Sequence, residues 1–267
     1  MKTRFLSIVM AGMALLAACS QPASKQAPEN GTQVKVIFDN AKPRTMPLDL
    51  FGEVPEAIVS ELGIAQGVPA SVSVMLVNRA GKNILFDAGN GNKDSQLMGK
   101  LAEAGVKPEA VDYIFITHLH GDHIGGLVKD GQRVFSQAKL YIPATELEAW
   151  TNREGGAPQN VATLVKAYEG SLVAFTYTDA LPCDIKALPA HGHTPGHTIY
   201  QLDKELIVGD IMHGVALQQV HPEYCARYDM NPEQAIESRK KVLELAKTQG
   251  LSLYGMHFPS TEAWVIK

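Results

Sequence analysis

The chain has 267 residues, with 24 basic and 28 acidic side chains and a formal net charge of −4. This length allows one domain with a sizeable core. The acidic balance and the lack of any run of basic residues argue against nucleic-acid binding.

Residues 1–18 have the pattern of a secretory signal peptide. Lys2 and Arg4 precede an almost wholly apolar run, Phe5 to Ala18, which is too short to span a bilayer comfortably. Small residues then precede Cys19, as in the lipobox of bacterial lipoproteins, whose cysteine is lipidated and becomes the first residue. The alternative is an ordinary cleaved signal with an incidental cysteine. We expect a lipoprotein on the periplasmic side of the outer membrane, anchored only through Cys19.

The remaining sequence is expected to hold a tether and one domain. Residues 19–31 are rich in Pro, Ala, Ser and Gln and have nothing to bury, so they are predicted to be a flexible tether. Residues 32–267 contain no internal boundary or repeat. Cys183 and Cys225 could pair in an oxidising compartment or stay apart as core thiols, and pairing of two chains into a homodimer is equally open.

Strands and helices are predicted to be intermixed along this domain. The β-rich runs are Gln33–Phe38, Ser71–Arg79, Lys82–Phe86, Asp112–Ile116, Lys139–Ile142, Leu172–Tyr177, Thr198–Leu202, Glu205–Val208 and Leu251–Tyr254. Helices are predicted at Ser95–Ala104, at Ala144–Thr151 and from Pro232, capped by Asn231, to just before Gly250. Residues 41–70, rich in proline and apolar side chains, are expected to form a covering loop. The mixture predicts an α/β protein with two sheets.

The chemistry is concentrated in the segment Thr117–Gly126, which follows the predicted strand Asp112–Ile116. Its side chains should lie on a tight loop at a strand end, where glycine lets the backbone turn sharply. Imidazole nitrogens and carboxylate oxygens are ligands that zinc prefers. One tetrahedral ion that keeps an open position would take fewer than four ligands from one loop. We therefore predict two metal ions side by side. The candidate ligands here are His118, His120, Asp122 and His123.

Three later segments supply further candidates. The run His191–Thr198 holds three histidines among turn-forming residues, and His197 directly precedes a predicted strand. One apolar strand ends at Asp210, and the last predicted strand is followed by His257. Each signal alone is weak, because a single Asp or His at a strand end is usually structural. Their order after the first loop gives them weight.

The series of motifs resembles the metallo-β-lactamase superfamily over nearly the whole chain after the tether. Within it, the pattern is similar to the dinuclear hydrolases that include acyl-homoserine lactonases and methyl parathion hydrolase. The resemblance implies an αββα sandwich, with two mixed sheets flanked by helices and the site at one edge of the sheets. It also implies two divalent metal ions, usually zinc, although manganese, iron or cobalt could occupy such ligands.

The same resemblance implies a role for each candidate. One metal would be held by His118, His120 and His197. The other would be held by Asp122, His123 and His257, with Asp210 bridging both. His191 and His193 match the turn rather than the ligand set and are expected to make structural hydrogen bonds. Related lactonases often carry a tyrosine at the position of His213, which could donate a proton or hydrogen bond to substrate or simply support the site.

The resemblance implies hydrolysis of a small molecule by a bridging hydroxide, with Asp122 and Asp210 fixing the metals and orienting the nucleophile. Lactone or ester cleavage is the first expectation and phosphotriester cleavage the alternative. Asp210 argues against antibiotic hydrolysis, because β-lactamases of this fold lack the bridging aspartate. A glyoxalase-like thioesterase is disfavoured, since no basic cluster for glutathione is apparent in the sequence. A non-catalytic zinc-binding lipoprotein is the alternative of another class.

Overall fold

The computed structural model of the protein describes residues 32–266. The predicted signal peptide 1–18, the tether 19–31 and the lipidation site Cys19 lie outside the described residues. Among the residues that are described, no helix has the length and apolar character needed to cross a membrane.

The first sheet has six strands in the order β1-β4-β5-β6-β9-β10. Their bounds are Gln33–Phe38, Ser73–Arg79, Lys82–Phe86, Tyr113–Phe115, Lys139–Pro143 and Leu172–Phe175. Strand β4 is antiparallel to β1 and β5, whereas β5, β6, β9 and β10 run parallel. The carboxyl ends of the parallel strands therefore meet at one edge, where the segments after β5, β6 and β9 begin.

The second sheet has five strands in the order β11-β12-β13-β14-β15. Their bounds are Lys186–Pro189, Thr198–Leu202, Glu205–Gly209, Ser252–Gly255 and Trp264–Val265. Strands β13 and β14 are parallel, so the residues that follow them also lie at one edge. Two small ladders complete the strands. They pair β2 (Arg44–Met46) with β3 (Val68–Ala70), and β7 (Val128–Lys129) with β8 (Gln132–Arg133).

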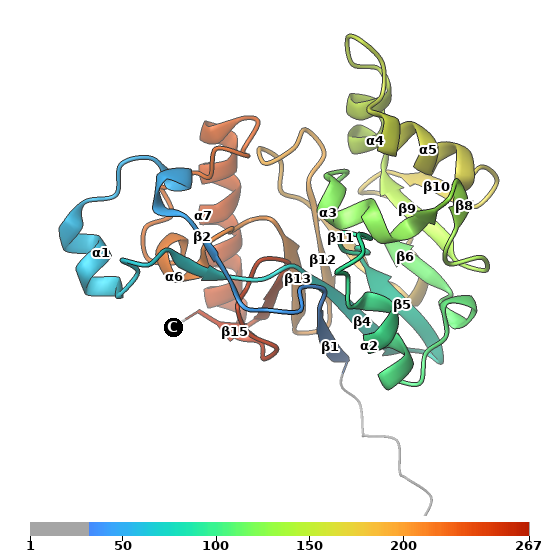
Figure 1. The fold of residues 1–267 in the computed structure, drawn as a ribbon, viewed down its shortest axis with the longest axis horizontal. Coiled ribbons are helices and arrows are strands. Elements are labelled where there is room, and N and C mark those ends of the chain that lie inside the picture. Colours follow the sequence, from blue (N-terminus) through green and yellow to red (C-terminus); the bar gives the residue numbers. More distant parts are fainter. Residues whose placement is uncertain (1–31, 267) are drawn as a thin grey trace, which may run out of the picture. The chain divides into compact units, whose positions relative to one another are not determined.

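Seven α-helices surround the sheets within residues 32–266. They are α1 (Glu56–Leu62), α2 (Leu97–Glu103), α3 (Gly121–Ile124), α4 (Ala144–Thr151), α5 (Gln159–Ala167), α6 (Val215–Gln218) and α7 (Pro232–Gln249). Short 3-10 turns lie at η1 (Leu48–Phe51), η2 (Pro108–Ala110), η3 (Gly125–Leu127) and η4 (Pro182–Asp184). Figure 1 shows α7 beside the second sheet and α2 and α5 on the side of the first sheet.

The alternation of side chains along each strand builds the layers. On β4, Val74 and Leu76 pack in a cluster with α2 and α5, while Met75 and Val77 face the other way. Met75 and Val77 belong to a cluster that joins both sheets, and α7 covers the outer face of the second sheet. These contacts confirm the predicted αββα arrangement.

The predicted elements agree with the structure except where tertiary packing decides. Each predicted strand and helix overlaps an observed one, and Asn231 caps α7 by accepting from the Gln234 amide at 3.1 Å. The prediction of a loop at residues 41–70 is wrong in part, because this segment holds β2, α1 and β3, whose apolar side chains form a cluster with Leu217 of α6. Helix α5 and strand β11 were not predicted. Cys183 and Cys225 are free thiols.

A substitution between the sheets tests the sandwich. Phe115 is fully buried and its ring stacks on Tyr141 with centroids 4.8 Å apart. Because Phe115→Ala leaves a cavity between the sheets, we expect a loss of about 3–5 kcal/mol in the free energy of unfolding, measured by urea denaturation. The control Met98→Ala, at a side chain 39% exposed, should change it by less than about 0.5 kcal/mol. Equal effects of both variants would contradict this packing.

Candidate metal centre

The candidate ligands converge where the strands of both sheets end. His118 and His120 follow β6, and Asp122 and His123 lie on α3 directly after them. Asp210 follows β13 and His257 follows β14. Of these side chains, His120, Asp122, Asp210 and His257 line one cavity of about 700 Å³, which His193 and His213 also line. The polar groups therefore stand on rigid strand ends rather than on long loops.

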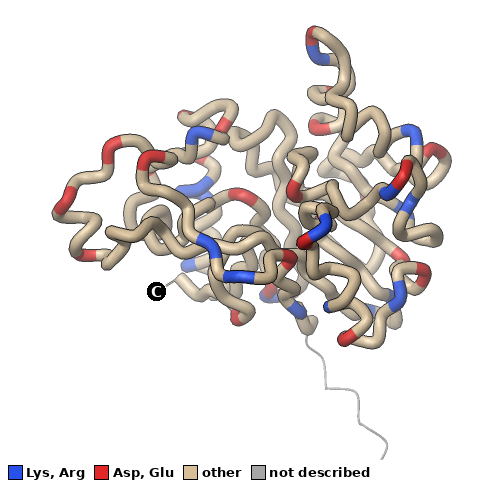
Figure 2. The backbone as a smooth tube through the Cα atoms, viewed as in Figure 1, with Lys and Arg blue, Asp and Glu red and all other residues tan. Residues whose placement is uncertain are grey.

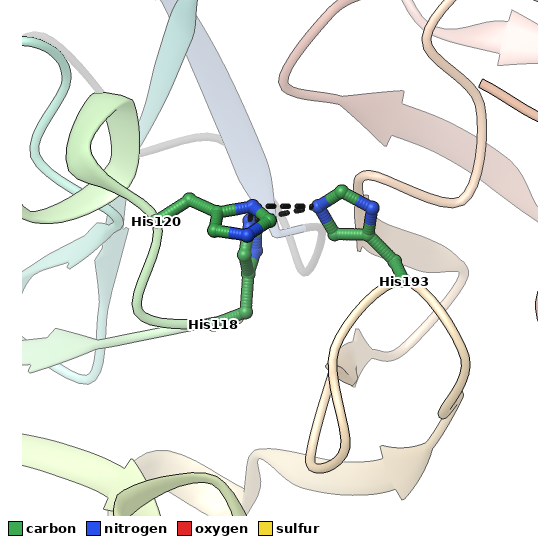
Figure 3. A group of neighbouring side chains, drawn as sticks. All are labelled: His118, His120 and His193. Atoms are coloured by element: carbon green, nitrogen blue, oxygen red, sulfur yellow. Dashed lines mark hydrogen bonds between the residues drawn. The ribbon is translucent and has the colours of Figure 1, made fainter. Parts of the chain in front are cut away.

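Three histidines form the first group of candidate ligands (Figure 3). His118 Nε2 lies 3.0 Å from His120 Nδ1, and His193 Nε2 lies 3.1 Å and 2.9 Å from those two atoms. Nitrogens that bind one tetrahedral zinc at about 2.0–2.1 Å stand about 3.4 Å apart, so this spacing is close to that of a ligand set. His193 Nδ1 donates to Asp229 Oδ1 at 2.9 Å, which leaves the Nε2 lone pair for a cation.

Asp122, His123 and His257 form the second group. Asp122 oxygens lie 3.8 Å from His123 Nε2 and 3.6 Å from His257 Nε2. The other nitrogen of each ring is already bonded, since His123 Nδ1 is 2.6 Å from Asp87 Oδ2 and His257 Nδ1 donates to the Ser71 carbonyl at 2.8 Å. Both Nε2 atoms therefore point into the group.

The Asp210 carboxylate lies between the two groups. Its Oδ1 is 3.2 Å from His123 Nε2, and its Oδ2 is 3.0 Å from His257 Nε2 and 3.4 Å from His193 Nε2. His123 Nε2 and Asp210 Oδ1 are buried without a hydrogen-bond partner. A divalent cation in each group would bind such orphaned atoms, so the residues present fit two divalent ions.

Electrostatics supports neutral imidazoles at His118 and His120 of the first group. Burial lowers the pKa of His118 well below its usual value, and burial together with His193 lowers the pKa of His120 to about 4. At Asp210, burial raises the pKa, but His123 and His257 more than offset it and hold the pKa well below its usual value. His118 and His120 thus offer nitrogen lone pairs beside an ionised carboxylate, the donor types that a borderline divalent metal prefers.

The prediction of His197 as a ligand does not agree with the structure. Its Nδ1 donates to the Ala190 carbonyl at 3.0 Å, and its Nε2 accepts from the Asp210 amide at 3.0 Å. No ring nitrogen is left for a metal. The third nitrogen of the first group comes instead from His193, for which we expected only structural hydrogen bonds. Its place in a Gly-His-Thr-Pro-Gly turn, rather than at the start of a strand, is the signal that could have found it.

Three buried carboxylates that the motif reasoning did not assign hold the ligand loops. Asp87 accepts from the Thr117 amide at 2.8 Å as well as contacting His123. Glu146 joins the two histidine segments, because it accepts from the Leu119 amide at 2.9 Å and the Gly196 amide at 2.8 Å. Each carboxylate therefore fixes a loop that carries a candidate ligand.

The third of these carboxylates, Asp229, links His193 to a buried arginine. Arg239 of α7 is 1% exposed and its Nη2 lies 3.3 Å from Asp229 Oδ2. It also donates to the backbone carbonyls of Ile211, Pro222 and Tyr224. Helix α7 thus positions both the segment after Asp210 and the orientation of His193.

His213 lies inside the cavity next to the candidate bridging residue. Its Nε2 is 3.2 Å from Asp210 Oδ2, and its Nδ1 is buried without a hydrogen-bond partner. Its ring centroid is 5.6 Å from that of Tyr228, which is half exposed at the cavity wall. This placement suits contact with a bound molecule, and the role of His213 stays a prediction.

Comparison with known proteins gives the family. The sequence model described as the metallo-beta-lactamase superfamily matches residues 67–248. The chain belongs to the metallo-β-lactamase superfamily. It is a hydrolase of this superfamily, with His and Asp groups that are candidates for metal binding.

Solved structures share the fold of this metallo-β-lactamase-type chain. The hydrolase AbOPH of the β-lactamase superfamily has a TM-score of 0.77 and 27% identity, over 87% of this chain and 89% of that one. AidC, described as a dizinc quorum-quenching lactonase in complex with its product, has the same TM-score at 22% identity, over 87% and 89% of the chains. At that identity the likeness to AidC shows the fold alone.

Curated relatives match over a short part of the chain. Ribonuclease Z of Salinibacter ruber is 42% identical over 72 residues, which is 26% of this chain. Ribonuclease Z of Geobacillus kaustophilus is 38% identical over 72 residues, or 25% of this chain. The chain spans about a fifth of the length of these relatives, 21% and 22%. A match over so short a part gives no basis for assigning the substrate of these relatives to this chain.

Substitution of the two histidines separates the ligand from the structural residue. His193→Ala should lose a metal ion from the first group, because one of its three nitrogens disappears. His197→Ala should keep both ions but lose about 1–3 kcal/mol of unfolding free energy, because buried backbone groups lose their partner. Elemental analysis after dialysis and urea denaturation measure the two effects. Metal loss in His197→Ala alone would restore the original assignment.

Proposed function

We propose that this protein is a dinuclear metal-dependent hydrolase that cleaves a lactone or ester of a small molecule, with zinc as the native metal. The observation that supports this most is the Asp210 carboxylate, which lies between two groups of candidate ligands within one cavity. A non-catalytic zinc carrier would need no carboxylate shared between two groups beside an open cavity of this size.

Two divalent ions bound at such a site would make a water molecule more acidic and polarise the scissile carbonyl. The side chains of the protein would hold the metal ions and orient the reacting groups. Asp122 and Asp210 keep the ligand groups at a fixed spacing, and Glu146 and Asp87 hold the loops that carry the histidines. We further propose that His213, which faces the cavity beside Asp210, donates a hydrogen bond or a proton to the substrate.

The cavity supports a small-molecule substrate. Its volume of about 700 Å³ falls within the range of typical ligand pockets. Lactone or ester cleavage ranks first because the family includes lactonases such as AidC, whose overall fold this chain shares. Because the metals carry the reaction and the surrounding segments choose the molecule, the substrate class is a matter for direct assay.

A hydrolysis panel tests the proposed function. We expect the full-length protein, purified in detergent and loaded with zinc, to hydrolyse an acyl-homoserine lactone or an aromatic lactone or ester faster than a phosphotriester, a cephalosporin or a glutathione thioester. His118→Ala and Asp210→Asn should reduce the rate to background, because each removes a candidate ligand. Turnover of the phosphotriester alone would favour the alternative substrate class. Two bound metals without any turnover would favour the non-catalytic alternative.

We also propose that the protein is a lipoprotein anchored on the periplasmic side of the outer membrane. The support is the sequence pattern of residues 1–19. Cys19→Ser should abolish fatty-acid labelling and release the protein from the outer-membrane fraction, because the lipid on Cys19 is the only anchor in this proposal. Fractionation of cells labelled with palmitate measures both, with Cys225→Ser as the matched control. Unchanged labelling of Cys19→Ser would contradict the anchor.

A further inference from the structure

A second cavity opens beside the metal cavity. It has a volume of about 530 Å³ and shares Arg44 and Asn90 with the larger one. Lys42 and Lys93 also line it. A molecule with one end at the metal centre can therefore extend past Arg44 into this outer cavity without leaving the protein surface.

The outer cavity carries an excess of unpaired positive charge. Among residues 32–266, the side chains of Lys42, Arg44 and Lys93 take part in no ion pair. Of the two acids in its wall, Asp39 is 1% exposed and already accepts from the amides of Asn90 at 2.8 Å and Leu97 at 3.1 Å.

The second acid, Asp94, is exposed, so this wall carries three cations against two carboxylates. Figure 2 shows the basic segments on β2 and on the connection that precedes it. On a chain whose net charge is −4, the sign of the charge is therefore reversed locally at the entrance of the metal cavity.

Arg44 is held where it can act on a substrate. Its backbone pairs with Ala70 in the β2–β3 ladder, and the side chain of Met46 on the same strand is buried in the cluster around α1. The guanidinium has a planar fork of donors that matches a carboxylate, and this pairing is stronger than a hydrogen bond between neutral groups. Since Arg44 lines both cavities, a carboxylate held by it would belong to the same molecule that reaches the metal centre.

We infer that the outer cavity binds a carboxylate of the substrate, so that the hydrolase acts on lactones or esters that carry a second, anionic group. The substrate class rests on the proposed function, whereas the anion site itself does not. Arg44 makes the first contact with the carboxylate, and Lys42 and Lys93 add to the attraction farther out. Binding energy from this remote group helps to place the scissile carbonyl at the centre.

Binding of simple carboxylates tests the anion site without turnover. The probes are succinate, adipate and suberate, each compared with the monocarboxylate of equal length, butyrate, hexanoate or octanoate. One carboxylate of each probe can lie at the metals, and only a dicarboxylate can also reach Arg44. Calorimetry on the full-length, zinc-loaded protein should show, for at least one length, a dicarboxylate that binds about tenfold more tightly than its partner.

Variants assign that preference to Arg44. In Arg44→Gln the ratio of the two affinities should fall close to one, because the fork of donors is lost. The matched control Lys240→Gln removes one positive charge on α7, lines neither cavity, and should leave the ratio unchanged. Equal affinities in the unaltered protein, or a preference that survives Arg44→Gln, would overturn the inference.

A pair of esters separates this inference from the proposed function. The 4-nitrophenyl ester of hexanoic acid and the mono-4-nitrophenyl ester of adipic acid differ only in the terminal carboxylate. We expect kcat/KM to favour the adipate ester about tenfold, mainly through KM, and Arg44→Gln to remove the difference. Hydrolysis of both at equal rates would refute the anion site and keep the function. A dicarboxylate preference in binding, with every ester and lactone inert, would refute the function and keep the site.

Discussion

The arrangement of the candidate metal centre depends on the buried carboxylate of Asp210. It is 3% exposed, and Nε2 atoms of His118, His123, His193, His213 and His257 lie between 3.0 and 3.9 Å from its oxygens. An ionised carboxylate away from water is costly unless charge and hydrogen bonds compensate it. Burial lowers the pKa of His123 and His257, but Asp210 more than offsets it and raises both, so these rings compensate the carboxylate as cations. Divalent cations bound in the two groups would supply that positive charge instead.

Such a cluster requires precise support, and the fold supplies it from both sheets. Strands β5 and β6 end just before Asp87 and the first histidine segment, while β13 and β14 end just before Asp210 and His257. The carboxylates of Asp87, Glu146 and Asp229 then bond the ring nitrogens and loop amides that surround the centre. Because these partners come from elements far apart in sequence, the site forms only when the two sheets pack together.

The walls of the cavity come from other segments of the chain than the candidate ligands. The segment 41–70 packs as a cluster of its own against α6 and places Arg44 and Met46 beside the candidate metal ligands. The segment after Asp210, fixed by Arg239, brings Tyr228 to the same cavity. Metals carry out hydrolysis in many members of a superfamily, but such added walls choose the molecule. Although the chain as a whole is acidic, the positive charge at this entrance would select anionic substrates.

The sequence by itself determined the class of the fold and most of the candidate site. Periodic apolar runs located the central strands, the cap at Asn231 located α7, and the spacing of His118, His120, Asp122 and His123 indicated a two-metal loop. These signals are local, so they can be recognised without knowledge of partners. The elements within residues 41–70 and helix α5 could not be predicted from the sequence, because their stability comes from contacts with distant elements.

Only the tertiary structure decided which histidine of the second segment faces the candidate metal centre. His193 and His197 are four residues apart among the same turn-forming residues, and either could supply a nitrogen. Packing settles the choice, because the Ala190 carbonyl and the Asp210 amide occupy both nitrogens of His197, whereas Asp229 occupies only one of His193. The basic entrance was likewise hidden, since Arg44 and Lys93 meet only where β2 lies beside the segment that precedes α2. A ring nitrogen or a charge is available for function only if nothing else in the fold binds it, and that depends on non-local contacts.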